Sequence, residues 1–139
     1  MARKTAIEIE GVIYDALEPY FNGKVSGMLY KSDCRPLDSN LEDAVVAVGN
    51  TNAEQIQNGR ARVNIYVPDI DNGTGRCVPD KERLTELSKL TEEILNVLNS
   101  ADTDYLFLLA QATGIIAAPE IKQHFVNITL EFDCITFNN

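Results

Sequence analysis

The acidic stretch after the middle of the chain is the first place where side chains are spaced for chemistry. The segment Asp69–Gly73 (DIDNG) resembles the start of a calcium loop, in which alternating oxygen ligands surround the ion. The register fails, because with Asp69 as the first ligand Thr74 takes the position that needs glycine. Asp80 likewise stands where a bidentate glutamate is expected. We interpret the segment as a turn or an arm that contacts a partner, and a structural calcium ion near Asp69 is the lesser alternative.

The glycines that follow could in principle bind phosphate. Gly73 and Gly75 lie between a predicted strand and a predicted helix, where phosphate-binding loops occur. The third glycine and the lysine of such a loop are absent, and Pro79 and Asp80 open the helix instead. The nearby carboxylates would repel an anion. No nucleotide, cofactor or metal is therefore expected.

Residues for nucleophilic catalysis are few. His124 is the only histidine, and it stands at the start of a predicted strand, where a satisfied or half-exposed side chain is the simpler interpretation than a general base. A cysteine nucleophile would need that histidine as its partner. Cys34, Cys77 and Cys134 lie too far apart in sequence for a disulfide framework or a zinc module. We predict no catalytic residues.

The segment Asn58–Pro68 is the strand around which the chain is organised. Every second residue is apolar: Ala61, Val63, Ile65 and Val67. The residues between them are Arg60, Arg62, Asn64 and Tyr66. A period of two predicts a strand with one face on the core. The other face is either solvated or contacts another subunit, because arginine and tyrosine are favoured at interfaces.

Two helices and about five strands are expected to position these residues. Apolar residues recur at helical spacing over residues 4–21 and 81–99. Thr5 with Glu8 predicts a capping box, and Asp80 an N-cap for the second helix. Strands are predicted at residues 23–30, 44–49, 58–68, 105–110 (with a continuation towards 117) and 124–134.

The connections between these elements are uneven in length. Residues 31–43 and 68–79 are predicted as long loops, which are functional or mobile when they occur in a compact domain. A short helical turn is expected around residues 53–56. The order helix, three strands, helix, two strands indicates a single α+β domain over residues 1–139. Its sheet is antiparallel or mixed, with both helices on one face. The central and final strands alternate so regularly that they could be neighbours.

Composition narrows the class of partner. The formal net charge is −9 and the isoelectric point about 4.5, which argues against a general nucleic-acid-binding surface. No signal peptide and no membrane span are expected. The sparse cysteines indicate a reducing compartment.

Several segments carry a resemblance to a known group of proteins. They are Gly27–Lys31 (GMLYK), Arg35-Pro36, the stretch 39–46, Gly59 and the stretch 63–68 (VNIYVP). These are similar to small proteins encoded in the head–tail and tail region of phages and prophages. The order of elements also resembles that of tail terminator and head–tail joining proteins, over nearly the whole chain.

The resemblance implies a structural role in virion assembly and no enzymatic activity. Such proteins form rings, commonly hexameric, that contact tail-tube or head-connector proteins and let double-stranded DNA pass. The implied location is the bacterial cytoplasm during assembly and then the virion. Candidate subunit contacts lie on the central strand and in the two long loops: Arg35, Arg60, Arg62, Tyr66, Asp69, Asp71 and Arg76. The alternatives are a non-viral binding module that uses the same sheet face and, last, an enzyme with an acidic site.

Overall fold

The first helix covers one end of the sheet. The computed structural model describes residues 5–49, 58–101 and 103–135. Helix α1 (Ala6–Phe21) begins at the expected capping box, in which the Thr5 hydroxyl accepts from the Glu8 N–H and the Glu8 carboxylate accepts from the Thr5 N–H. Its buried stripe faces the sheet, and the chain leaves it through Gly23, whose φ of 89° suits glycine.

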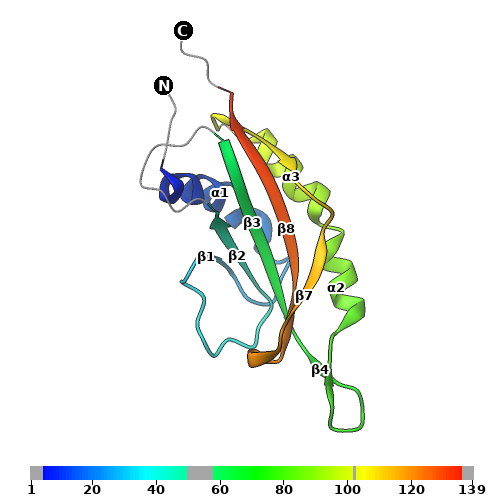
Figure 1. The fold of residues 1–139 in the computed structure, drawn as a ribbon. Coiled ribbons are helices and arrows are strands. Elements are labelled where there is room, and N and C mark those ends of the chain that lie inside the picture. The colour runs from blue at the N-terminus through cyan, green and yellow to red at the C-terminus, as the bar shows by residue number, and fades with distance from the viewer. Residues whose placement is uncertain (1–4, 50–57, 102, 136–139) are drawn as a thin grey trace.

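The sheet is mixed and has six strands, in the order β1-β2-β3-β8-β6, with β7 also paired to β8 (Figure 1). The strands are β1 (Leu29–Lys31), β2 (Asp43–Val48), β3 (Asn58–Pro68), β6 (Tyr105–Leu109), β7 (Gly114–Ala118) and β8 (Gln123–Cys134). Among these six strands, only the β1–β2 pair is parallel. Strands β3 and β8 pair from Asn58↔Asp133 to Pro68↔Gln123, which confirms that the two regular strands are neighbours. The α+β fold with a mixed sheet is also confirmed.

The second helical segment is interrupted, where the sequence predicted one helix. Helix α2 (Lys81–Ser88) begins at Asp80, whose carboxylate accepts from the Arg83 N–H, and α3 (Thr91–Ser100) follows after two residues. The Ser88 hydroxyl donates to the Thr85 carbonyl, and the Thr91 hydroxyl donates to the Ser88 carbonyl. Such local bonds compete with regular helical bonding and account for the break.

Two strand predictions and one loop prediction need correction. The strand expected over 23–30 is confined to β1, because the chain turns after Gly23 and Gly27 bonds to the Glu42 carbonyl. The loop expected over 68–79 contains the hairpin of β4 (Ile70–Asp71) and β5 (Cys77–Val78). The strand expected from 105 is two strands, which pair with successive parts of the twelve-residue β8 and are followed by the 3-10 turn Pro119–Ile121. The turn expected at 53–56 lies outside the described residues.

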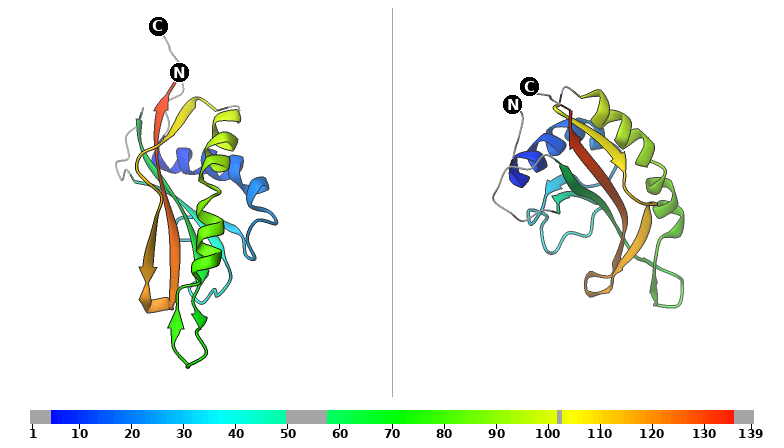
Figure 2. Two further views of the ribbon diagram at one scale, coloured as in Figure 1. Left: turned by 90° about the vertical axis from the view of Figure 1, so that its right-hand side faces the viewer. Right: turned by 45° about the horizontal axis from the view of Figure 1, so that its top comes forward.

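The helices lie on one face of the sheet, as expected, and the core lies between them and the sheet (Figure 2). Leu17 and Phe21 of α1 and Ile94 and Leu98 of α3 belong to one buried cluster with the inward residues of β3 and β8, and all four are fully or almost fully buried. A fully buried side chain of this size contributes about 1.5–3 kcal/mol. Tyr20 also joins α1 to α3, because its Oη donates to Glu93 Oε1 at 2.7 Å. Burial, and then this bond, raise the pKa of Tyr20.

Candidate interaction surface

The outer face of the sheet is the side that carries no helix. Register places every second residue of the strands on it. Its members include Val45, Ala47, Arg60, Arg62, Asn64, Tyr66, Leu106, Leu108, Ile116, Phe125, Asn127, Thr129, Glu131 and Asp133.

The middle of the outer face is ordered by its own side chains. The Tyr66 and Phe125 rings are cross-strand neighbours with centroids 4.8 Å apart. Asn127 Nδ2 donates to Asn64 Oδ1 at 2.8 Å, and the Thr129 hydroxyl donates to Asn127 Oδ1 at 3.0 Å. These polar groups satisfy one another, so the side chains at the centre of the face are pre-organised.

Exposed apolar side chains gather where β6 joins β8. Leu106 and Leu108 are 41% and 53% exposed. They lie next to Asp133 and Glu131, and Arg60 lies on the far side of Glu131, with its Nη2 4.0 Å from Glu131 Oε2. Such an exposed ion pair contributes little to stability. An apolar pair with a charged rim has the composition of a protein interface.

The loop over residues 32–42 is fastened to the opposite corner of this face. Arg35 Nε donates to Asp43 Oδ2 at 2.8 Å, and Arg35 Nη2 donates to Gln123 Oε1 at 2.9 Å. The Arg35 guanidinium also lies 4.4 Å from the centroid of the Tyr66 ring. We predicted both side chains as subunit contacts from sequence. In the structure Arg35 holds its own loop in place and Tyr66 lies beneath it, and their role as subunit contacts stays a prediction.

Asp43 is the buried centre of that clamp. Its carboxylate also accepts from the Met28 N–H at 3.0 Å and from the Ser39 hydroxyl. Gly27 makes room for it, because a Cβ there would stand 1.8 Å from Asp43 Oδ1 and 2.6 Å from the Glu42 carbonyl oxygen. The close approach of two backbone segments therefore explains this glycine.

Two of the three hairpin candidates serve local structure. Asp69 Oδ1 lies 2.7 Å from His124 Nδ1, and Asp71 Oδ1 accepts from the N–H groups of Gly73 and Gly75. Arg76 is exposed on the hairpin. Among residues 5–49, 58–101 and 103–135, no three His, Cys, Asp or Glu side chains are grouped to hold a metal ion.

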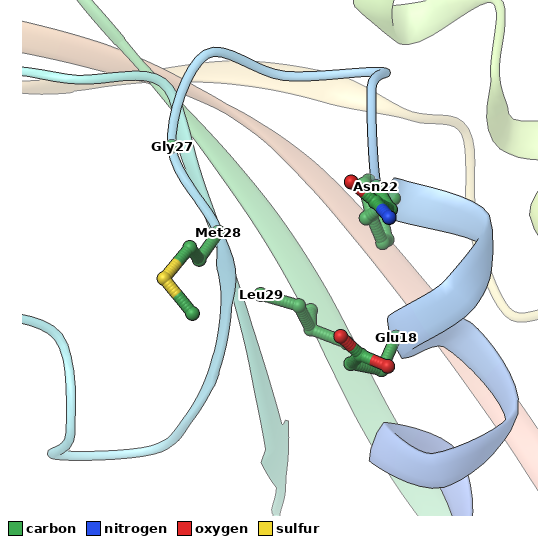
Figure 3. A pocket seen from close by; sticks show the side chains of 6 residues that line it. Glu18, Asn22, Gly27, Met28 and Leu29 are labelled. Atoms are coloured by element: carbon green, nitrogen blue, oxygen red, sulfur yellow. The ribbon is translucent and has the colours of Figure 1, made fainter.

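A small hollow lies between the end of α1 and the segment before β1 (Figure 3). Glu18, Phe21, Asn22, Gly27, Met28 and Leu29 line it. Glu18 is the single ionisable side chain in this lining, so the hollow brings no acid–base pair together.

The leucines of β6 were missed as candidates, although a signal was present. Residues 105–110 form a continuous apolar run with no alternation, which places apolar side chains on both faces of a strand. Tyr105 and Phe107 fill the core, and Leu106 and Leu108 must then point outwards.

Comparison with known proteins supports the fold alone. No family model matches the chain, and no curated protein matches it. Several solved structures are similar, and one of them has a TM-score of 0.50 and 14% sequence identity over 94% of this chain and 96% of that chain. No helix in the described part of the chain is long and apolar enough to cross a membrane.

Proposed function

We propose that the chain is a structural subunit of phage or prophage virion assembly. In this proposal it acts in a ring of the tail-terminator or head–tail joining kind. The observation that carries the assembly role is the outer face, which no helix covers and which exposes Leu106 and Leu108 within a charged rim. The phage context is supported by the sequence resemblance.

The distribution of charge favours contact through this face. On the outer face the exposed Arg60 and Arg62 balance Glu131 and Asp133. On the helices, which lie on the other side, the exposed charged residues are Lys81, Lys89 and seven carboxylates: Glu8, Asp15, Glu18, Glu82, Glu86, Glu92 and Glu93. Each copy carries a net charge of −9, so two copies repel one another least when they meet through the outer face, where positive and negative side chains balance.

A closed ring needs two different patches on each subunit. The β4–β5 hairpin supplies a second one, because it projects beyond the end of the sheet (Figure 1) and exposes Ile70 and Arg76. We infer that the hairpin of one copy contacts the outer face of the next. The acidic helical side would then be free to border the path of DNA, which it would repel and so allow to slide.

The test is the mass of the native protein in solution. Light scattering over a concentration series, with negative-stain images, is expected to show a closed ring. The variant Leu108→Glu adds a charge at the apolar pair and should reduce the ring to smaller species. The matched control is Ile7→Glu, which adds the same charge at an exposed isoleucine of α1 on the other side of the molecule.

Two outcomes would contradict the proposal. One is a protein that stays monomeric alone and with purified tail-tube or connector proteins. The other is an assembly that Leu108→Glu and Ile7→Glu affect equally. A monomer that instead binds an unrelated protein through Leu108 would favour the non-viral binding module.

A further inference from the structure

The edge of the sheet formed by β6 and β7 is closed along one half and open along the other. Both strands pair with β8 on one side only. An edge strand presents free N–H and C=O groups that can pair with another strand, and natural proteins usually block them. A further strand can therefore be added where the outward N–H and C=O groups of the edge strand are not yet hydrogen-bonded.

The β6 half is blocked by two side chains. Asn99 on α3 makes two bonds to Phe107: its Oδ1 accepts from the Phe107 N–H and its Nδ2 donates to the Phe107 carbonyl, both at 2.8 Å. The Thr103 hydroxyl bonds the N–H and the carbonyl of Tyr105 in the same way, at 3.2 and 3.1 Å. The outward backbone groups of both residues are thereby occupied.

The β7 half carries no such block. Residues 105–119 contain no charged side chain, and no proline precedes Pro119 in that run, so the usual devices that protect an edge are missing. Ile115 and Ile116 are 47% and 45% exposed on opposite faces of β7. Among the described residues, no side chain bonds to the backbone of β7.

Strand alternation identifies the outward groups of β7. The Ala110 N–H bonds to the Thr129 carbonyl, so the odd-numbered residues of β8 face this edge. β8 pairs with β3 without a bulge, so the same parity holds down to Gln123. Gly114, Ile116 and Ala118 pair with such residues and therefore face β8. Ile115 and Ala117 turn their N–H and C=O groups outwards.

We propose that β7 pairs antiparallel with β7 of a second copy, about a twofold axis at Ile116. In this register Ile115 lies opposite Ala117 of the other copy, and the two pairs use all four outward N–H groups and all four outward carbonyls. On one face a large side chain meets a small one, and on the other the two Ile116 side chains meet across the axis. No charged residue lies opposite another, which suits copies that each carry −9.

This contact goes beyond the proposed function and uses different residues. It is isologous and cannot close a ring by itself, whereas the proposed contact through Leu106 and Leu108 is heterologous. A variant of β7 therefore tests the pairing without touching the apolar pair on β6, and failure of one proposal does not decide the other.

The first experiment removes an outward donor and leaves the sheet intact. Proline at 117 has no N–H, and the N–H of Ala117 points away from β8, so Ala117→Pro retains the ladder within the chain. We expect sedimentation equilibrium to show at least a tenfold weaker twofold association than for the parent. If Ala117→Pro lowers the thermal midpoint of the protein, Ala117→Lys is used in its place, because a lysine on an edge strand also opposes pairing with a second strand. Association that neither folded variant weakens would overturn the proposal.

The second experiment tests the register by cross-linking. With the native cysteines replaced by serine, Ile116→Cys places two thiols in a non-hydrogen-bonded pair, where opposed Cβ atoms are about 4.5–5.5 Å apart. Ile115→Cys places them diagonally, about 7–8 Å apart, too far for a disulfide. We expect mild oxidation to give a covalent dimer with Ile116→Cys and little with Ile115→Cys. Equal yields, or none with Ile116→Cys, would refute this register.

Discussion

Replacing Asp43 by alanine should destabilise the fold more than any exposed ion-pair variant. The carboxylate is fully buried and accepts from Arg35, Ser39 and the Met28 N–H. Removing one partner of a buried ion pair leaves the other charge uncompensated, which costs about 3–5 kcal/mol. Arg35 keeps its bond to Gln123, so we expect the lower part of that range.

The assay is thermal and urea unfolding followed by circular dichroism. The unfolding entropy of a chain of 139 residues is about 0.3 kcal/mol/K. A loss of about 3 kcal/mol therefore lowers the thermal midpoint by about 10 °C. Glu131→Ala is the control, because it removes a half-exposed ion pair with Arg60 and should cost under about 1 kcal/mol.

A double-mutant cycle tests the physical cause. If Asp43 and Arg35 act through each other, the double variant Arg35→Met/Asp43→Ala should cost clearly less than the sum of the single variants. A coupling of about 1–3 kcal/mol is expected for contacting groups. Strict additivity, or a loss for Asp43→Ala no larger than that for Glu131→Ala, would refute the clamp as described.

Three further results are expected. Gly27→Ala should lower the free energy of unfolding by more than about 1 kcal/mol and slow formation of soluble protein, because the new Cβ collides with backbone as well as with Asp43. An unchanged urea unfolding curve would contradict this. Asn99→Ala should cost about 1–3 kcal/mol and speed amide exchange at Phe107, whose outward groups it frees; Asn99→Asp, which keeps only the acceptor, is the graded control. In an alkaline absorbance titration, the tyrosinate absorbance of Tyr20→Phe should fall below that of the parent only above pH about 10, because the Tyr20 phenol ionises above the ordinary pKa of tyrosine. The folded-state pKa of Tyr20 is raised, so its stabilising effect is present below the unfolded pKa and is lost as the pH rises through the folded value.

Periodic segments of the sequence predicted their structure well, for local reasons. The eleven-residue β3 and the twelve-residue β8 alternate strictly, and their register follows from which face is buried. The capping box at Thr5 and the N-cap at Asp80 depend on residues only three apart, so they too were visible in the sequence. The packing of the helices on one face of the sheet also followed from the order of the elements.

The candidate contacts were harder to predict, because polar residues in loops have no period. Arg35 is eight residues from Asp43 and 88 from Gln123, and only the folded chain shows that it is engaged by both. Asp71 was expected in a turn or in an arm that contacts a partner, and it is a turn former for the hairpin. Of the predicted contact residues, Arg60, Arg62, Asp71 and Arg76 are exposed. Leu106 and Leu108 were absent from the predicted contact residues, although the structure exposes both.

The clamp and the apolar pair Leu106 and Leu108 occupy different corners of the sheet. Asp43 pairs with Tyr66 at one end of β3, on the β2 side. Leu106 pairs with Asp133 at the other end of β8, on the β6 side, so the apolar pair and the clamp lie diagonally opposite. Arg35 also covers the Tyr66 ring and so keeps that corner from extending the apolar surface. Loss of Asp43 should therefore lower stability and leave the contact through Leu106 and Leu108 unchanged per folded molecule, whereas Leu108→Glu should weaken that contact and leave stability unchanged.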